Sequence, residues 1–378
     1  MSHIHKDKSH QGRVILEEVP GLIRVYDEEH VERPQIVPNV PCNALAFELG
    51  VTAKDVTMDK HTSLWARIYV PNTNHAGKHL LPLLVYFHGG GFCVGSASWN
   101  CYHEFLANLA AKVGCVIVSV NYRLAPENRL PVAYEDGFNA MTWIKQQALN
   151  VPSDQKWWLN KCNLSNLFLA GDSAGANLAH HIATRLSTCD FSLLKPLFLK
   201  GIILIQPFFG GESRTMSEKH ATQPPISALT LSSSDTYWRL SLPLGASRDH
   251  PWCNPLARGG AAKLSDLRLP KTLVCISELD ILKDRNLEFC STLSAAGKKV
   301  ETVIHKGVGH AFQILSCLKL FLGAVQVCCV GCFVTVYGQV GLHLAAFYIL
   351  CNEMETSIAK RIGGLALNLS HSVSVKLH

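Results

Sequence analysis

The sequence has few charged residues and no concentrated basic region. Charged residues make up 17% of the 378 residues, and the formal net charge is only +6. No run of Lys and Arg alternates with aromatic residues, which argues against a nucleic-acid-binding surface. Because 48% of the residues are hydrophobic, the chain can bury a sizeable core, and long disordered regions are not expected.

The first residues, MSHIHKDKSHQG, lack the apolar stretch of a secretory signal. We therefore expect a cytoplasmic protein in which most of the 14 cysteines are reduced and buried. Cys329 and Cys332 have the C-x-x-C spacing of metal ligands, but no second pair matches them. The sequence therefore predicts no metal site.

Apolar, β-branched runs alternate with segments of helical period between about residues 80 and 310. Strands are expected at 83–87, 115–120, 167–170, 202–205, 272–276 and 301–305. Helices are expected at 99–113, 134–149, 174–186 and 284–296. Strands that are apolar throughout are typical of a parallel sheet covered on both faces. An antiparallel hairpin is expected at 55–59 and 65–70, and a Ser-, Thr- and Pro-rich insertion at 211–245 is either a lid or a surface excursion.

The motif Gly171-Asp172-Ser173-Ala174-Gly175 fits the G-x-S-x-G pattern of a nucleophile elbow. An expected strand precedes it and an expected helix follows it, which is the context that such an elbow requires. Glycines flank the serine because a sharp strand-to-helix turn brings backbone segments too close for side chains. The helix directs its positive end at the site, where the N–H of Ala174 can stabilise an oxyanion. Ser173 is therefore the candidate nucleophile.

A second motif, His88-Gly89-Gly90-Gly91, follows an earlier expected strand. Consecutive glycines allow several backbone N–H groups to converge on one developing negative charge. An ordinary glycine-rich turn is the alternative. A phosphate-binding loop is disfavoured because neither the Walker spacing nor G-x-G-x-x-G is present. The chain between this motif and Ser173 has room for two strand–helix units, which would place both motifs at one edge of the sheet.

A serine nucleophile needs a general base and a group that orients this base. In folds that carry the elbow, the chain order is Ser, then Asp or Glu, then His. Asp280 and His310 follow successive expected strands, so both are expected on loops at the edge that carries Ser173. The alternatives are Glu278 and Asp284 for the acid and His305 for the base.

Together these motifs resemble those of the plant carboxylesterases, within the hormone-sensitive-lipase-like α/β-hydrolases that also include the gibberellin receptors. The resemblance extends from about residue 17 to residue 315. It includes 21–34 (GLIRVYDEEHVERP), 121–130 (NYRLAPENRL), 237–243 (YWRLSLP) and 245–255 (GASRDHPWCNP). It implies an α/β-hydrolase fold with a mostly parallel sheet, helices on both faces and a lid. The implied activity is hydrolysis of a small to medium carboxylic ester.

The resemblance also implies roles for individual residues and requires neither a metal nor an organic cofactor. The implied residues are Ser173 as nucleophile, Asp280 as acid, His310 as base, Gly89, Gly90 and Ala174 as the oxyanion hole, and Tyr122 and Tyr237 in the substrate pocket. The principal alternative is a non-catalytic small-molecule receptor on the same fold. The receptors lack the catalytic histidine and usually the third glycine, whereas this sequence keeps Gly91 and His310 and so resembles the enzymes.

The likeness ends near residue 315. Relatives continue with a polar loop and an amphipathic helix, whereas residues 320–351 contain no Asp, Glu, Lys or Arg and are long enough to span a bilayer. Two hypotheses stay open: a membrane anchor, and an aberrant tail that leaves the loop of His310 without support and the enzyme inactive. The predicted organisation is a lid-forming segment (1–60), a catalytic domain (61–315) and an atypical hydrophobic tail (316–378). No oligomeric state is predicted.

Overall fold

The computed structural model describes residues 13–44, 49–72, 80–188, 194–220, 227–257 and 264–315. The hydrophobic tail (316–378), with the potential membrane anchor at 320–351, lies outside the described residues. Within the described ranges, no helix combines the length and the hydropathy of a membrane span.

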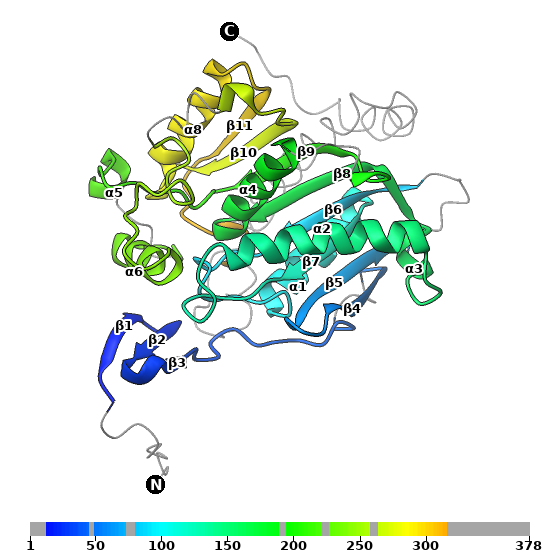
Figure 1. Ribbon diagram of the computed structural model, residues 1–378, viewed down its shortest axis with the longest axis horizontal. Coiled ribbons are helices and arrows are strands. Elements are labelled where there is room, and N and C mark those ends of the chain that lie inside the picture. The colour runs from blue at the N-terminus through cyan, green and yellow to red at the C-terminus, as the bar shows by residue number, and fades with distance from the viewer. Residues whose placement is uncertain are drawn as a thin grey trace, which may run out of the picture. The chain divides into compact units, whose positions relative to one another are not determined.

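The main sheet confirms the predicted α/β architecture. Across the described ranges it contains eight strands in the order β11-β10-β9-β8-β6-β7-β5-β4 (Figure 1). The parallel strands are β6 (Leu81–Phe87), β7 (Val116–Asn121), β8 (Cys162–Asp172), β9 (Leu199–Ile205), β10 (Lys271–Ser277) and β11 (Val300–His305). The expected antiparallel hairpin is also present, with β4 (Val51–Asp59) at the edge and β5 (Leu64–Pro71) beside β7.

Helices cover both faces of this sheet. They are α1 (Asn100–Val113), α2 (Val132–Asn150), α4 (Ala174–Thr188) and α8 (Lys283–Ala295), with the short α3 (Lys156–Leu159) before β8. The chain moves along the sheet in one direction from β6 to β7 and in the opposite direction from β7 to β8. Because parallel crossovers are right-handed, this reversal places α1 on one face and α2, α4 and α8 on the other (Figure 1). The loops that leave β6 and β8 thereby diverge, which is where open α/β sheets bind ligands.

The central strands are buried on both faces, which explains their continuous apolar pattern. Residues 116–120 of β7 are all 0% exposed, and the apolar side chains of β6 and β8 pack against the same core. A strand covered on one face would instead alternate apolar and polar side chains. The near-continuous apolar runs therefore indicate two things: that these segments are strands, and that helices cover both faces of the sheet.

The structure also contains elements that the apolar pattern did not predict. A separate three-stranded antiparallel sheet is formed by β1 (Ile15–Val19), β2 (Ile23–Tyr26) and β3 (Val31–Glu32), with a 3-10 turn, η2 (Asp27–Glu29), before β3. Its strands are short and rich in charged residues, and ion pairs such as Arg24 with Glu18 link them. The strand β8 begins at Cys162, earlier than the expected start at residue 167. Its first part was not predicted because residues 163–166 are polar or only half-buried and form no apolar run.

The insertion predicted at 211–245 is partly helical. It contains α5 (Met216–His220) and α6 (Leu231–Ser241). The helix α6 begins with a capping box: the Thr230 hydroxyl accepts a hydrogen bond from the N–H of Ser233, and the Ser233 hydroxyl accepts one from the N–H of Thr230. This local signal explains why α6 starts directly after a Pro- and Ser-rich segment.

Candidate active site

Ser173 lies at a sharp turn between β8 and α4. Its φ of 53° is in the left-handed region, and only 6% of the residue is exposed. The turn is closely packed, because a Cβ placed on Gly175 would lie 2.0 Å from the carbonyl oxygen of Phe87. The Ser173 N–H donates to the carbonyl of Ile205 at 2.8 Å, which ties the turn to the end of β9. The local geometry is that of a nucleophile elbow.

The structure brings Asp280 and His310 together with Ser173. His310 Nε2 lies 2.9 Å from Ser173 Oγ, and His310 Nδ1 lies 2.6 Å from Asp280 Oδ2. Asp280 is 1% exposed and His310 is 3% exposed, so both hydrogen bonds are protected from water. Because a carboxylate only accepts hydrogen bonds, Nδ1 carries the proton and Nε2 is free to accept the hydroxyl proton of Ser173.

The alternative acids and the alternative base lie elsewhere. Glu278 accepts the Gly307 N–H at 2.8 Å, and Asp284 accepts the Ser217 N–H at 2.7 Å. His305 is the last residue of β11 and packs against Phe312, with 5.0 Å between the ring centroids. None of the three is hydrogen-bonded to His310 or Ser173 in the described structure.

The glycine loop after β6 offers backbone donors, but Gly89 is not one of the free ones. The Gly89 N–H donates to the Tyr102 hydroxyl at 2.8 Å. Within the described structure, the N–H groups of Gly90, Gly91 and Ala174 have no hydrogen-bond acceptor. The Gly89 N–H is thus engaged by Tyr102, which does not favour its predicted part in an oxyanion hole, whereas the N–H groups of Gly90 and Ala174 are available for such a role.

Asp172 joins the glycine loop to the serine turn, a role that the sequence did not reveal. Its carboxylate is 1% exposed and accepts hydrogen bonds from Tyr86 at 2.8 Å and from Tyr102 at 3.0 Å. Tyr102 in turn accepts the N–H of Gly89, so one chain of hydrogen bonds connects both loops. Burial raises the pKa of the Asp172 carboxyl to about 6, although the two tyrosine hydroxyls oppose the rise. The only available signal was the position of Asp172 inside the serine motif.

His88 and Tyr122 brace the glycine loop from behind. Tyr122 donates its hydroxyl to the His88 carbonyl at 2.8 Å, and the two rings stack with centroids 4.3 Å apart. Burial lowers the pKa of His88 to about 4, so its ring is neutral near pH 7. Tyr122 is 1% exposed and braces the loop through this bond and this stack, and its contact with substrate stays a prediction.

Tyr237 lies on α6 directly against the glycine loop. A Cβ placed on Gly91 would be 2.3 Å from Cγ of the Tyr237 ring, so only glycine fits at that position of the loop. The insertion thus reaches the same edge of the sheet as Ser173. The predicted place of Tyr237 beside a substrate pocket is compatible with this contact, although the contact does not test it.

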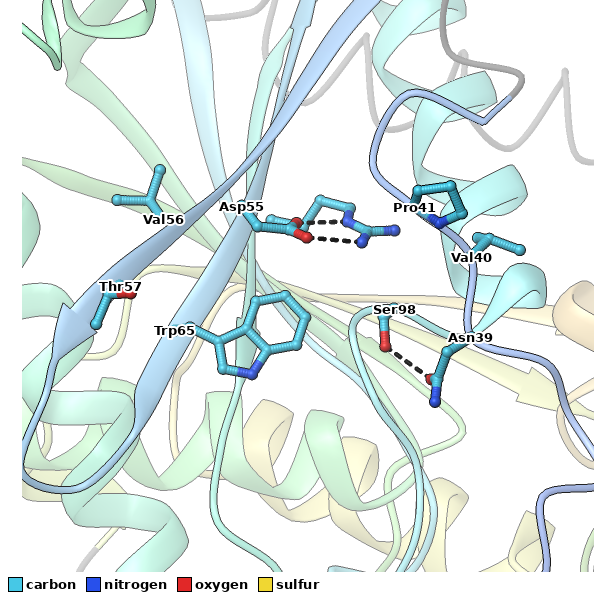
Figure 2. Close-up of a pocket in the computed structure, with 9 residues that line it drawn as sticks. Asn39, Val40, Pro41, Asp55, Val56, Thr57, Trp65 and Ser98 are labelled. Atoms are coloured by element: carbon cyan, nitrogen blue, oxygen red, sulfur yellow. Dashed lines mark hydrogen bonds and ion pairs between the residues drawn. The ribbon is translucent and has the colours of Figure 1, made fainter.

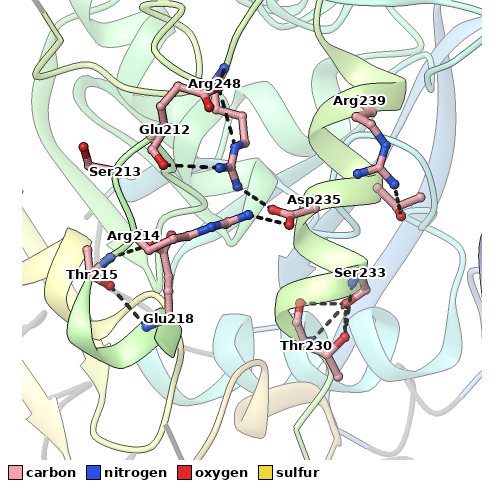
Figure 3. A network of polar contacts seen from close by, with 12 residues as sticks. Glu212, Ser213, Arg214, Thr215, Glu218, Thr230, Ser233, Asp235, Arg239 and Arg248 are labelled. Atoms are coloured by element: carbon pink, nitrogen blue, oxygen red, sulfur yellow. Dashed lines mark hydrogen bonds and ion pairs between the residues drawn. The ribbon is translucent and has the colours of Figure 1, made fainter. Parts of the chain in front are cut away.

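Ion pairs connect the N-terminal sheet and the insertion to each other and to the loops. Arg239 of α6 donates to Glu17 of β1, and Arg33 forms a bidentate pair with Glu127. Asp235 of α6 accepts from Arg214, which precedes α5, and from Arg248, which follows the insertion (Figure 3). The carboxylate between two guanidinium groups holds α6 to the segment before α5.

A groove of about 490 Å³ lies away from these residues. It is lined by Asn39, Val40, Pro41, Asp55, Val56, Thr57, Trp65, Arg67 and Ser98 (Figure 2). Its buried guanidinium, Arg67, is held by two hydrogen bonds to Asp55, at 2.6 and 2.9 Å. The charges in the groove therefore neutralise each other, and none of the residues expected to act on an ester lines it.

The cysteines show no paired arrangement in the part of the chain that the structure describes. Those resolved there are free thiols and most are buried, including Cys93, Cys115 and Cys253. The same residues contain no group of three or more His, Cys, Asp and Glu side chains placed to hold a metal ion. The described cysteines thus behave as small apolar core residues.

Comparison with known proteins places this geometry in a family. The family model for the alpha/beta hydrolase fold matches residues 84–314, which include both loops, Asp280 and His310. The chain belongs to the α/β-hydrolase family. Probable carboxylesterase 6 of Arabidopsis thaliana is 51% identical over 302 residues, which are 80% of this chain and 85% of that protein.

Other relatives of this chain include both a receptor and an esterase. Gibberellin receptor GID1B of Arabidopsis thaliana is 36% identical, over 73% of this chain and 76% of the receptor. Among solved structures, a hyperthermophilic esterase from the archaeon Pyrobaculum calidifontis superposes with a TM-score of 0.58 and 26% identity, over 80% of this chain and 90% of the esterase. Both enzymes and receptors are thus related to this chain, and the resemblance stated from its motifs is confirmed at the level of the family.

Proposed function

We propose that this protein, a carboxylic ester hydrolase by its relatives, cleaves its ester through an acyl-enzyme intermediate on Ser173. The observation that carries the proposal is a pair of buried hydrogen bonds: His310 Nδ1–H donates to Asp280 at 2.6 Å, and the Ser173 hydroxyl donates to His310 Nε2 at 2.9 Å. A serine hydroxyl is a weak nucleophile unless a base removes its proton, and the base works best when a third group fixes its tautomer.

In the first half of the reaction, Ser173 Oγ attacks the acyl carbon while its proton moves to His310 Nε2. Asp280 stabilises the imidazolium that forms and stays ionised. His310 then gives the proton to the leaving alkoxide, the C–O bond of the ester breaks, and the alcohol departs. The acyl group stays on Ser173 as an ester.

In the second half, His310 takes a proton from water, and the resulting hydroxide attacks the acyl carbon. The bond to Ser173 Oγ breaks, the proton returns to Ser173, and the acid leaves. Both tetrahedral intermediates carry a negative oxygen that needs backbone donors. We assign this role to the N–H groups of Gly90, Gly91 and Ala174, because the N–H of Gly89 is engaged by Tyr102.

The N-terminal sheet β1–β3 and the insertion with α5 and α6 are the proposed lid. Three observations support this assignment: Tyr237 packs on Gly91, Arg239 pairs with Glu17, and Arg33 pairs with Glu127. The aromatic side chain of Tyr237 at the glycine loop favours a small to medium ester with an apolar portion. Within this proposal, the N-terminal part of the lid ends before β4 and not at residue 60 as predicted, because β4 (Val51–Asp59) belongs to the main sheet.

A receptor function is the alternative that the 36% identity to a gibberellin receptor raises. A receptor needs the pocket but not the proton transfer from Ser173 to His310. The aligned hydrogen bonds of these two side chains therefore favour the enzyme. A cell-based response that survives Ser173→Ala would favour the receptor.

The test is hydrolysis of 4-nitrophenyl acetate by the full chain, with Ser173→Ala and Ser187→Ala alongside. Ser187 lies near the end of α4, away from Asp280 and His310, and serves as the matched control. We expect kcat to fall by at least about 10³-fold in Ser173→Ala and to be unchanged in Ser187→Ala. Equal rates in all three proteins would exclude Ser173 as the nucleophile.

A further inference from the structure

Gln206 is a buried polar residue at the carboxyl end of β9, between the loops that carry Ser173 and His310. It is 1% exposed, and its φ of 48° is in the left-handed region, which is uncommon for a residue with a long side chain. Its backbone N–H donates to the carbonyl of Cys275 at 2.8 Å, so the turn is anchored to β10. A strained backbone conformation persists only where surrounding contacts stabilise it, so the partners of the Gln206 side chain are of interest.

The Gln206 amide bonds to the two segments that lead to Asp280 and His310. Its Oε1 accepts the N–H of Ala311 at 2.7 Å, and its Nε2 donates to the hydroxyl of Ser277. Ala311 directly follows His310, and Ser277 is the last residue of β10, ahead of Asp280. Both partners are buried, at 4% and 0% exposure. The Gln206 side chain therefore bridges the histidine loop and the strand that leads to the acid.

The backbone on either side of Gln206 is hydrogen-bonded to a third segment, the turn that carries Ser173. The carbonyl of Ile205 accepts the Ser173 N–H at 2.8 Å, and the N–H of Phe208 donates to the Ser173 carbonyl at 3.0 Å. The nucleophile turn is thus fixed to the residues on either side of Gln206. The segment 205–208 is therefore hydrogen-bonded to Ser173 itself, to the residue after His310, and to Ser277, three residues before Asp280.

We infer that Gln206 is a positioning residue, which sets the distance between His310 and Ser173 by holding the N–H of Ala311 and the hydroxyl of Ser277. The inference rests on the proposed function in that the aligned residues are those of the ester hydrolase. Ala311 itself has a φ of 61°, so the histidine loop adopts an unfavourable turn that needs an external partner. Without the Gln206 amide, the buried N–H of Ala311 would be unpaired, and the loop would gain by moving toward another acceptor.

Gln206→Met is the disruptive variant, because methionine has a similar shape and removes both hydrogen bonds. Gln206→Glu is the conservative variant, because it keeps an oxygen that can accept the N–H of Ala311. Gln155→Met is the matched control. Gln155 is also a buried glutamine, at 7% exposure, and accepts the Trp158 indole N–H at 2.9 Å next to α3. Its side-chain hydrogen bonds, to Asp154 and Trp158, involve none of the segments that carry the three reacting residues.

The first measurement is kcat and KM for 4-nitrophenyl acetate. We expect kcat to fall about 10- to 100-fold in Gln206→Met with KM changed by less than about twofold, because a small displacement of the base slows proton transfer without removing the substrate site. Gln206→Glu should recover most of the lost kcat. Gln155→Met should lower the unfolding midpoint and leave kcat unchanged. Wild-type kcat in Gln206→Met, or an equal loss of kcat in Gln155→Met, would overturn the inference.

The second measurement does not depend on turnover. The low-field proton NMR signal of the His310 Nδ1–H, which is hydrogen-bonded to Asp280, reports the alignment of the loop directly. We expect this signal to shift or disappear in Gln206→Met and to persist in Gln155→Met. If it responds in this way while the wild-type protein hydrolyses no ester, the positioning role stands and the proposed function fails. If the signal is the same in both variants, the positioning role fails whatever the activity.

Discussion

The catalytic edge and the proposed lid are held together by different kinds of contact. The edge, at the carboxyl ends of β6, β8, β9 and β10, is fixed by buried hydrogen bonds such as those of His310 with Asp280 and of Gln206 with Ala311. The proposed lid is fixed largely by ion pairs that water reaches, and the side chains of Arg239 and Glu17 are 56% and 27% exposed. Buried bonds are short and direction-dependent, whereas exposed ion pairs are weak and screened by salt.

This difference suits the work of each region. The edge has to keep Ser173, His310 and the oxyanion donors in one arrangement, because small displacements reduce the rate strongly. A lid has to admit a substrate and release two products, so contacts of low energy are an advantage. Substitutions at the edge should therefore have larger effects than substitutions at the lid.

The largest effect is expected from Asp280→Asn. The asparagine amide can donate to His310 Nδ1, which favours the tautomer that carries its proton on Nε2 and cannot accept the proton of Ser173. We expect kcat to fall by roughly 10⁴-fold with the unfolding transition nearly unchanged. Steady-state kinetics with 4-nitrophenyl acetate and a urea titration measure the two quantities. Glu278→Gln is the matched control, and a comparable loss in that variant would point to a different acid.

Gly175→Ala should break the edge through sterics. The added methyl group would lie 2.0 Å from the carbonyl oxygen of Phe87, so β6 and α4 would have to separate. We expect the unfolding free energy to fall by about 3 kcal/mol, since overpacking of a close backbone contact is not relieved by rotating a side chain. Gly245→Ala is the control, because that glycine has positive φ but open space around it. Equal losses in the two variants would show that the close approach is unimportant.

Asp172 makes the stability of the edge depend on pH. Its folded-state pKa of about 6 lies above the ordinary value of 3.8, so folding favours the protonated form. The stabilisation is fully present below about pH 4 and is lost as the pH rises to about 6, a loss of up to about 3 kcal/mol. In Asp172→Asn this group no longer titrates. The unfolding free energy of the variant minus that of the wild type should therefore rise between pH 4 and pH 6, as measured by urea unfolding at several pH values. A difference that does not vary with pH would contradict the raised pKa.

The smallest effect on stability is expected at the lid. Arg239→Ala removes the exposed pair with Glu17 and should change the unfolding free energy by less than about 1 kcal/mol. Because the N-terminal sheet β1–β3 would leave α6 more often, we expect KM to rise a few-fold with kcat unchanged, and the wild type should approach the variant at high salt. Arg185→Ala, which breaks the exposed pair with Glu135 on the body of the domain, is the control. If both variants change KM equally, the pair with Glu17 has no special role.

The sequence predicted the central architecture because its signals are local. The apolar runs marked β6, β7, β8, β9, β10 and β11, and the G-x-S-x-G motif marked the turn after β8. The N-terminal sheet escaped prediction because its strands are short and charged and are stabilised by pairs such as Arg24 with Glu18, which leave no apolar period. The start of β8 was misplaced for a similar reason, since its first residues are polar.

At the site, the sequence by itself determined which residue types stand at the ends of which strands. The order Ser173, Asp280, His310 follows from strand ends along the chain, and parallel strands bring their carboxyl ends to one edge. Only the tertiary structure decided which of Asp280, Glu278 and Asp284 meets His310, because all three lie within a few residues of the end of β10. Backbone preferences are set by neighbours in the chain, whereas the pairing of side chains is a competition among partners that the fold brings together.

The same competition decided which N–H groups of the glycine loop already have an acceptor and which segments Gln206 joins. Three consecutive glycines offer equivalent N–H groups in the sequence, but Tyr102 from α1 takes the N–H of Gly89 and leaves those of Gly90 and Gly91. Gln206 carries no motif, and its partner Ala311 is far away along the chain. Hydrogen bonds between distant segments have no local signature, so their donors and acceptors become known only when the strands are in register.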